Sequence, residues 1–390
     1  MADRLIYLDH AATTPLDERV LAAMLPFFGE HFGNPSSIHR PGRAALDALD
    51  EARDTVAAVL GASAKEIVFT SGGSEADNLA VKGVALAQRA AGRGAHVITS
   101  AIEHHAVLHA VEALQASGFE VTLLPVGRDG IVAPDDLRAA IRPDTVLVSV
   151  MYANNEIGTL QPIAELGTIC RERGIPFHTD AVQAAGALPL NVRELNVDLL
   201  TISAHKFYGP KGVGALYVRN RTPLLPQING GGQERRRRAG TENVPGIVGL
   251  AAALRQAEAE RRQYVAHTAA LRDRLVAGVL ERVPGASLNG HPTQRLPNNA
   301  NIAFAGVEGE SVLLLLDQQG IAASSGSACT SGSLEASHVL LALGLPPERA
   351  IGSIRFTLGR GTTVEEIDYV IDALPPLIER LRSVAPVRDT

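Results

Sequence analysis

The amino-acid sequence predicts an α/β fold: a large domain with a mostly parallel sheet flanked by helices, followed by a smaller α+β domain. Short apolar runs alternate with amphipathic helical stretches along much of the 390-residue chain, which is the pattern of βαβ units. Polar residues and glycines follow the ends of these runs, where open α/β sheets bind their ligands. After a long helical stretch the alternation becomes less regular, which indicates the second domain.

The N-terminal part of the chain reads as a strand, a turn and two helices. Residues 5–15 give a short strand that runs into a turn, and a helix is expected over Leu16–Phe28. Residues 33–39 form a loop by composition. From Gly42 the apolar residues recur at helical spacing, and Gly61 ends that helix.

The next strand, Ile67–Thr70, runs into a glycine turn and a long alanine-rich helix. A strand, a glycine turn and a helix start place backbone N–H groups and the positive end of a helix dipole where a phosphate can bind. Gly73 and Ser74 are therefore candidate phosphate ligands. The stretch is neither a Walker A loop nor a GxGxxG motif, so an ordinary βα turn is the alternative.

The alternation continues, and several of the expected strands end at a chemically useful residue. Strands are expected at His96–Ser100, Glu120–Pro125, Thr145–Tyr152 and Ile175–His178, and an amphipathic helix at Ile163–Glu172. His104 follows the first of these strands, Asn155 the third, and Asp180 the last. Because carboxyl ends of parallel strands meet at one sheet edge, these side chains are expected to lie close together.

The most informative stretch is Ser203–Gly214, which follows the apolar strand Val197–Ile202. Lys206 lies just past the end of that strand, flanked by Ser203 and His205 as phosphate-compatible donors. A lysine in this position indicates the Schiff-base lysine of pyridoxal 5'-phosphate (PLP) chemistry. Taken alone, a lysine such as Lys206 is more often a solvated lysine on a Gly/Pro loop, and the residues described below reverse this preference.

Further along the chain, Val248–Leu280 is expected to be one long helical region that leads out of the large domain. We expect a PLP-binding large domain over residues 16–255 and a small domain over residues 256–390. The N-terminal segment 1–15 is expected to join the small domain.

Composition and charge exclude several classes of protein. The net charge is −6, from 42 acidic and 36 basic residues, which argues against direct nucleic-acid or membrane-surface binding. The apolar runs are too short to span a bilayer, and no signal peptide is visible. The chain has two cysteines and no CxxC or Cys/His cluster, so neither a zinc site nor a structural disulfide is expected. A reducing, cytoplasmic setting is the natural expectation.

Lysine-bound PLP needs further partners, and this chain can supply each of them at a predicted strand end. A carboxylate must pair with the pyridinium nitrogen so that the ring acts as an electron sink, and Asp180 suits this task. Gln183 and Asn155 can reach the phenolic oxygen, and His104 can cover the ring. Each residue has an ordinary alternative: Asp180 could be a helix N-cap, and His104 a satisfied polar residue at a helix start.

Taken together, the motifs resemble those of the cysteine desulfurases, which belong to the aminotransferase class V group of PLP enzymes. The matching stretches span nearly the whole chain in family order: Tyr7–Pro15, Gly33–His39, Thr70–Glu75, Glu103–His104, Ala153–Gly158, His178–Gln183, Ser203–Gly214, Arg238–Asn243, Ser324–Cys329 and Arg355–Phe356. The resemblance implies the PLP-dependent transferase fold of aminotransferase fold type I.

The resemblance also implies roles for individual residues. Lys206 would hold the cofactor covalently, Asp180 would pair with its ring nitrogen, and His104 would stack on the ring. The ring's phenolic side and the phosphate would be contacted by Asn155, Gln183, Ser74, Ser203 and His205. Thr241 would reach the phosphate of a neighbouring subunit, which implies a homodimer with shared active sites. Arg355 would bind the substrate carboxylate, for which its bidentate fork is suited.

One departure from the family pattern is Arg236, which stands where a glycine is usual. If that position requires positive φ, Arg236 is expected to be strained. The alternative for the surrounding basic run, Arg235–Arg238, is a solvated face.

The two cysteines are expected to differ. Cys170 falls in an amphipathic helix and is expected in the core. Cys329 lies in the Ser/Gly-rich stretch Ser324–Ser333, which predicts an exposed loop and a thiol that acts as a nucleophile. The stretch resembles the longer-loop branch of the family, which hands sulfur directly to scaffold proteins.

The implied reaction converts L-cysteine to L-alanine and leaves the sulfur on Cys329 as a persulfide. An acceptor, such as an iron–sulfur scaffold protein, a tRNA-thiolation pathway or a cofactor pathway, would then receive it. Three alternatives are a selenocysteine lyase, another class V enzyme such as an aminotransferase, and a non-catalytic scaffold. The intact Lys206, Asp180 and His104 set disfavours the last, and the Cys329 loop disfavours the aminotransferase.

Overall fold

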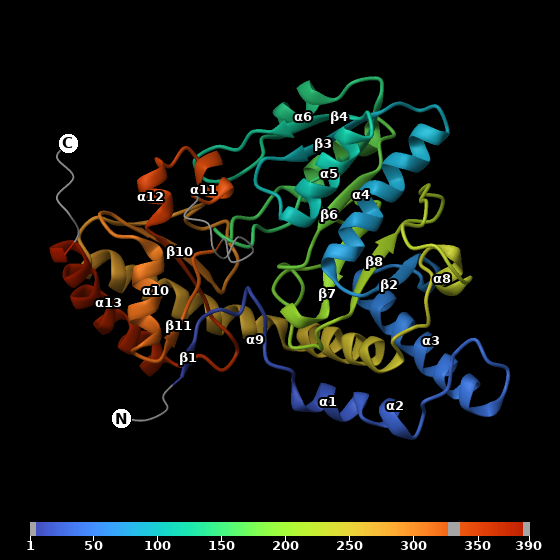
Figure 1. The fold of residues 1–390 in the computed structure, drawn as a ribbon, viewed down its shortest axis with the longest axis horizontal. Helices are drawn as coiled ribbons and strands as arrows, with labels where there is room; N and C mark the ends of the chain where they lie inside the picture. The colour runs from blue at the N-terminus through green and yellow to red at the C-terminus, as the bar shows by residue number, and fades with distance from the viewer. Residues whose placement is uncertain (1–4, 327–335, 385–390) are drawn as a thin grey trace.

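The computed structural model describes residues 5–326 and 336–384, and its largest element is a seven-stranded sheet (Figure 1). The strand order is β2-β8-β7-β6-β5-β3-β4. Only β8 runs antiparallel to its neighbours, so the sheet is mostly parallel. These strands are β2 (Ile67–Thr70), β3 (His96–Ser100), β4 (Glu120–Leu124), β5 (Thr145–Ser149), β6 (Phe177–Asp180), β7 (Leu199–Ser203) and β8 (Gly214–Val218).

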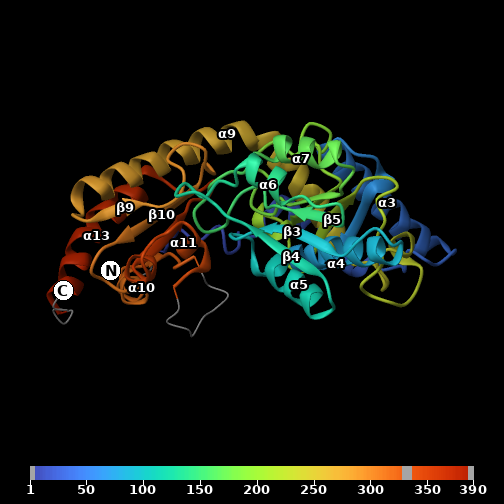
Figure 2. The same ribbon diagram turned by 90° about the horizontal axis from the view of Figure 1, so that it is seen from above.

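Helices cover both faces of this sheet (Figure 2). On one face lie α4 (Gly73–Ala90) and α5 (His105–Ala116). The other face carries α1 (Glu18–Met24), α3 (Arg40–Leu60), α7 (Ile163–Glu172) and the first half of α9 (Val244–Arg282). Shorter helices complete this part of the chain: α2 (Pro26–Gly29), α6 (Pro134–Ala140) and α8 (Gln233–Arg236). The predicted doubly covered, mostly parallel sheet is therefore confirmed.

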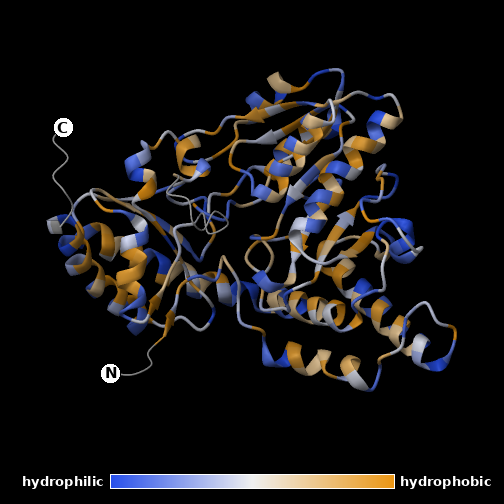
Figure 3. Cartoon of the chain, viewed as in Figure 1, coloured by the Kyte–Doolittle hydropathy of each residue, from blue (hydrophilic) through white to orange (hydrophobic). Residues whose placement is uncertain are grey.

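Local sequence explains these elements. The central strands are continuous apolar runs because both their faces are buried. Figure 3 colours such hydrophobic residues orange. Helix α3 buries one face through residues such as Leu49 and Val56, and it ends at Gly61, whose φ of +66° suits a glycine C-cap. The single helix expected over residues 16–28 is instead two helices. Pro26 has no N–H to continue the helical ladder, so the chain breaks there.

The C-terminal part of the chain forms a smaller α+β unit with its own core. A three-stranded antiparallel sheet has the order β12-β10-β9. The N-terminal strand β1 pairs in parallel with β11, so the start of the chain lies in this unit. Its elements are β1 (Ile6–Tyr7), β9 (Ala286–Leu288), β10 (Asn299–Phe304), β11 (Ile321–Ala322), β12 (Ser353–Thr357), α10 (Gly309–Asp317), α11 (His338–Ala342), α12 (Pro347–Ile351) and α13 (Val364–Val384).

Helix α9 connects the two units. Leu250 and Leu254 in its first half belong to the core beneath the large sheet, and Leu271 and Leu275 in its second half belong to the core of the small unit. The expected domain boundary at residues 255 and 256 falls inside this helix and stays a prediction. From β1 the chain passes between the two units to α1 (Figure 1), so the residues just after β1 are close to both.

Candidate active site

The carboxyl ends of β2, β3, β5, β6 and β7 lie at one edge of the large sheet, and the loops that follow them line a cavity of about 360 Å³. Ten of the residues singled out from the sequence line this cavity. They are Gly73, Ser74, His104, Asn155, Asp180, Gln183, Ser203, His205, Lys206 and Arg355. Residues far apart in the sequence thus meet because parallel strands all end at the same edge.

Lys206 closes a short 3-10 turn, Ala204–Lys206, directly after β7. Its Nζ donates hydrogen bonds to the carbonyl oxygens of Ala11, at 2.6 Å, and Ala12, at 2.8 Å. Gln183 donates from Nε2 to the same Ala11 oxygen at 3.0 Å. The N-terminal segment is therefore part of the site, although the sequence assigned no chemical role to Ala11 and Ala12. Their place in a family motif was the only signal that could have indicated them.

Asp180 is the last residue of β6, and it is buried. Its Oδ1 accepts a hydrogen bond from the Val182 backbone N–H at 2.8 Å. Burial raises the pKa of this carboxyl to about 6, while the charge of Lys206 opposes the rise. A buried carboxylate has most to gain from a cationic partner, so this position suits a protonated ring nitrogen.

A second buried carboxyl, Asp77, also lines the cavity and was missed in the sequence. It lies on α4, one turn after Gly73, and its Oδ1 is 3.6 Å from Nε2 of His178. Burial raises the pKa of Asp77, and the charge of Asp180 adds to this rise. A protonated Asp77 allows Asp180 to carry the negative charge, because two buried carboxyls close together do not both ionise readily.

His104 is the N-cap residue of α5, as its ordinary alternative expected, and it also lines the cavity; that it covers a cofactor ring stays a prediction. Its Nδ1 accepts a hydrogen bond from the Ala106 backbone N–H at 3.1 Å, which places the proton of the neutral ring on Nε2. Burial lowers the pKa of His104 to about 4, and the charge of Lys206 contributes. The ring is therefore neutral at physiological pH.

The start of α4 opens into an adjoining cavity of about 420 Å³ that is suited to an anion. Ser74, Ser203 and His205 line it together with the backbone of the glycine turn, and the helix adds its positive end. Nδ1 of His205 is 3.2 Å from the Thr13 hydroxyl oxygen. Lys211, which the sequence analysis did not single out, lines this cavity as well. Hydroxyls, backbone N–H groups and a cation are the donors that bind phosphate.

Arg355 extends from β12 into the cavity of about 360 Å³ beside Lys206, and its side chain is buried. Nη2 donates to Oδ1 of Asp9 at 2.8 Å, and Nη1 donates to the Asn155 carbonyl at 2.9 Å. Its buried Nε has no hydrogen-bond partner among the described residues. The guanidinium is thus held in place through both Nη atoms at the wall of the cavity, where its planar fork can bind a substrate carboxylate.

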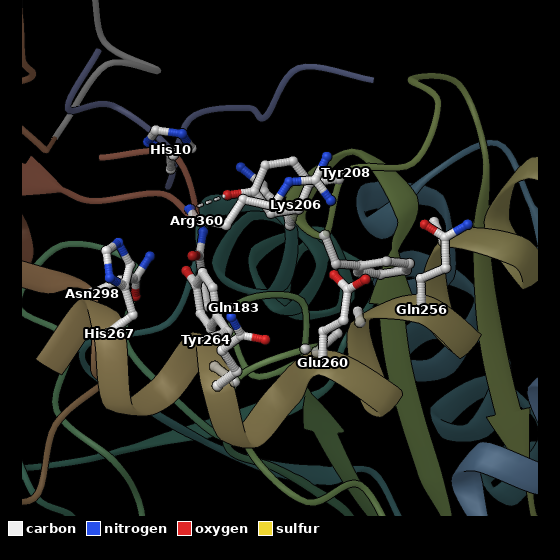
Figure 4. A pocket seen from close by; sticks show the side chains of 18 residues that line it. His10, Gln183, Lys206, Tyr208, Gln256, Glu260, Tyr264, His267, Asn298 and Arg360 are labelled. Atoms are coloured by element: carbon white, nitrogen blue, oxygen red, sulfur yellow. Dashed lines mark hydrogen bonds between the residues drawn. The ribbon is translucent and has the colours of Figure 1, made fainter. Parts of the chain in front are cut away.

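A larger cavity of about 620 Å³ lies beside the first, and Lys206 and Gln183 line both. Figure 4 shows its polar lining, with Arg360 close to Tyr208; the guanidinium carbon is 4.2 Å from the centre of the Tyr208 ring. Tyr264 extends into this space from α9. The catalytic lysine candidate is therefore bordered by two cavities.

The remaining candidates lie elsewhere. Thr241 is exposed and lines neither of the two cavities next to Lys206. Cys329 is outside the described residues. Cys170 is fully buried in α7, and burial raises the pKa of its thiol, which is what was expected of a core cysteine. Arg236 has a φ of +65°, so a left-handed conformation is indeed required where the family usually has glycine.

Among residues 5–326 and 336–384, no group of three His, Cys, Asp or Glu side chains is arranged to hold a metal ion. No helix in these ranges has the length and apolar character needed to cross a membrane.

The fold is of the α/β class and its candidate active site contains a lysine, and the comparisons with known proteins show the family. Residues 6–370 match the family model described as aminotransferase class-V. The chain is 54% identical over 385 residues to the cysteine desulfurase IscS of Methanosarcina thermophila, covering 99% of this chain and 95% of the relative. The corresponding protein of Dictyoglomus turgidum is 55% identical, covering 99% and 97%.

The solved structures agree with this result. A NifS-like protein superimposes with a TM-score of 0.91 at 39% identity, covering 97% of this chain and all of that one. The protein SspA in complex with cysteine gives a TM-score of 0.80 at 37% identity, covering 92% of this chain and all of that one. The chain therefore belongs to the aminotransferase class-V family and, within it, to the cysteine desulfurases, as its motifs predicted.

Proposed function

We propose that this cysteine desulfurase converts L-cysteine to L-alanine at the cavity beside Lys206 and transfers the sulfur to Cys329 as a persulfide. The observation that carries the proposal is the meeting of Lys206, Asp180, His104 and Arg355 around one cavity. This set provides a nucleophilic amine, a buried carboxylate, a neutral imidazole and a carboxylate-binding guanidinium.

The residues of the two adjoining cavities fit pyridoxal 5'-phosphate. Lys206 would hold it covalently, and Asp180 would pair with its ring nitrogen. Gly73, Ser74, Ser203 and His205 would bind its phosphate, with His104 over the ring and Asn155 and Gln183 on its phenolic side. When bound, PLP supplies an electron sink for the electrons released at the substrate's α-carbon.

The protein's own groups then divide the work on the substrate. Arg355, which lines the cavity, binds the substrate carboxylate and thereby fixes the orientation of the α-carbon. Lys206 is placed to take the α-proton. His104 is neutral because its pKa is lowered to about 4, so it can accept a proton and later donate one.

In the transfer step, the Cys329 thiolate attacks the sulfur of the substrate. A bond forms between the two sulfur atoms while the carbon–sulfur bond breaks, and the electron pair of that bond stays with the carbon. Protonation of this carbon and return of a proton to the α-carbon give L-alanine. The balance is L-cysteine plus the Cys329 thiol giving L-alanine plus the Cys329 persulfide, and no outside oxidant or reductant is needed.

Several parts of the proposal concern assembly and partners. Thr241, which is exposed, is proposed to reach the cofactor phosphate of the other subunit in a homodimer. A sulfur-acceptor protein, such as an iron–sulfur scaffold, is proposed to receive the persulfide sulfur. The cytoplasm is the proposed location because a thiol nucleophile needs a reducing compartment. The domains are proposed to divide within α9, where the side chains change from one core to the other.

The test compares Cys329→Ser with Cys170→Ala. Cys329→Ser should keep the cofactor absorbance and its change on adding L-cysteine, but alanine formation should fall by several orders of magnitude. Cys170→Ala should form alanine and persulfide like the wild type. Lys206→Ala should lack both the lysine-bound absorbance and turnover. Near-wild-type alanine production by Cys329→Ser would show that the persulfide mechanism is wrong.

A further inference from the structure

We infer that Glu156 is a positioning residue for the sulfur-transfer step, because its buried carboxyl fixes Ser337 at one end of the chain segment that carries Cys329 and lies against Gly326 at the other end. Glu156 belongs to the loop after β5 and does not line the cofactor cavity. The inference rests on the proposed function, since it concerns delivery of the Cys329 thiol. The proposed function itself assigns no role in the reaction to Glu156.

The first contact is made by Ser337, near the start of the second described range, residues 336–384. The Ser337 hydroxyl donates to Oε2 of Glu156 at 2.5 Å, and both residues are buried. The same Ser337 oxygen caps α11, because it accepts a hydrogen bond from the Val339 backbone N–H at 3.1 Å. Glu156 thus holds the serine that starts the helix after the Cys329 segment.

The other end of the segment, at Gly326, lies close to the same carboxyl group. A Cβ atom on Gly326 would lie 3.3 Å from the same Oε2 of Glu156, and the glycine has a φ of +88°. The Gly326 N–H donates to the Ser324 hydroxyl at 3.1 Å. Ser324 in turn exchanges two backbone hydrogen bonds with Arg355, at 2.6 and 3.2 Å. Both ends of the segment therefore lie beside one carboxyl oxygen. Ser337 is hydrogen-bonded to this oxygen, and the Gly326 end is linked through Ser324 to the proposed carboxylate-binding arginine.

Glu156 is itself fixed from both domains. Its N–H donates to the Asn154 side chain at 2.8 Å, within the large unit. Its carbonyl accepts hydrogen bonds from the side chains of Asn299 and Asn301 on β10, at 3.3 and 3.2 Å. A carboxyl anchored in this way can define where the segment leaves and rejoins the protein relative to the cavity.

The burial of this carboxyl supports a role beyond stability. Burial raises the pKa of Glu156, and only the Ser337 hydrogen bond and the charges of Arg355 and His105 oppose the rise. Well-packed apolar side chains usually stabilise a fold at least as well as a buried polar or charged group. A purely structural link between the two ends would not need a carboxyl here.

The experiment uses the PLP-loaded enzyme and separates substrate binding from sulfur transfer. Binding is measured as the L-cysteine concentration that half-saturates the change in cofactor absorbance. Transfer is measured as the single-turnover rate of alanine formation, with the Cys329 persulfide detected by mass spectrometry. The variants are Glu156→Ala, Ser337→Ala and Glu156→Gln, whose amide oxygen can still accept the Ser337 hydrogen bond.

We expect Glu156→Ala and Ser337→Ala to slow alanine and persulfide formation about ten- to a hundredfold, since small misplacements of a reacting group cost this much. Half-saturation should stay within about twofold of the wild-type value, and Glu156→Gln should restore most of the rate. Ser63→Ala is the matched control. It also removes a cap serine that donates to a glutamate, Glu66 at 3.0 Å, but in an exposed turn after α3.

Three results would overturn the inference: a wild-type transfer rate in the two alanine variants, equal losses in Glu156→Ala and Glu156→Gln, or a parallel loss of L-cysteine binding. The Cys329→Ser variant, measured beside them, separates the two proposals. If it blocks alanine formation and Glu156→Ala does not, the positioning role fails and the proposed function stands. If Cys329→Ser itself forms alanine, both proposals fail.

Discussion

Replacing Glu234 by alanine should destabilise the protein strongly, because this residue forms a buried ion pair at the start of the turn that leads to Thr241. The Glu234 carboxylate accepts hydrogen bonds from Nη2 and Nη1 of Arg53 at 2.6 and 2.8 Å, and from the Phe69 backbone N–H at 2.9 Å. The side chains of Arg53 and Glu234 are only 5% and 2% exposed. The turn itself is strained, since Glu234, Arg235 and Arg236 all have positive φ.

The magnitude follows from what the substitution leaves behind. Glu234→Ala would leave the Arg53 guanidinium buried without its carboxylate and the Phe69 N–H without its acceptor. Breaking a buried pair from one side costs about 3–5 kcal/mol. Arg53→Met should cost a similar amount. The double variant should lose about 1–3 kcal/mol less than the sum of the two single losses, because each single substitution removes the same interaction.

The assay is urea unfolding followed by far-UV circular dichroism, since the chain has no tryptophan. All variants should be compared at one protein concentration, because the proposed dimer would make stability depend on concentration. Asp368→Ala is the control: Asp368 pairs with Arg274 at 2.5 Å, but both side chains are exposed, so its loss should stay within about 1 kcal/mol. A Glu234→Ala loss no larger than that of Asp368→Ala would refute the reasoning.

The remaining predictions concern the site and the two thiols. Mixed dimers of Lys206→Ala and Thr241→Ala chains should recover one good site and part of the activity; no recovery in demonstrated mixed dimers would argue against a shared site. In the native protein a thiol-alkylating reagent should label Cys329 but not Cys170, which is fully buried, as peptide mass mapping will reveal. The pKa of His104 is lowered from 6.5 to about 4 in the folded protein. Between pH 6.5 and about pH 4 the unfolded chain therefore binds more protons than the folded protein, so the free energy of unfolding falls as the pH is lowered through this range. Relative to His104→Gln, the wild-type apoprotein should therefore lose up to about 3 kcal/mol of unfolding free energy from pH 7 to pH 4; a constant difference would contradict the assignment.

The sequence predicted the fold and most of the cavity because the signals involved are local. A buried parallel strand is an apolar run of a few residues, and a candidate ligand-binding residue lies at or just after its end. Asp180 is the last residue of β6, and Lys206 closes the short turn after β7. Each such pair can be recognised without knowing any long-range contact. The fold's topology then brings the strand ends together.

Residues that act through distant contacts could not be found in this way. Ala11 and Ala12 accept hydrogen bonds from Lys206 only because the N-terminal segment passes between the two units, which no local pattern encodes. Asp77 looks like any polar helical residue until the burial of α4 against the sheet is known.

Arg236 shows what a sequence pattern can and cannot predict at a position with a strained backbone. The departure from the family glycine predicted strain at Arg236 on the condition that the position requires a positive φ, and the structure has a φ of +65° there. The pattern could not explain why an arginine is tolerated there. The neighbouring Glu234 supplies a reason: its carboxylate is held by Arg53 and by the Phe69 N–H, so a buried ion pair stabilises a turn whose backbone is unfavourable by about 1–3 kcal/mol per residue. The buried ion pair therefore maintains the strained backbone conformation of the turn. Weakening the pair should let this turn relax to another conformation, and Thr241, which follows it, should then be displaced.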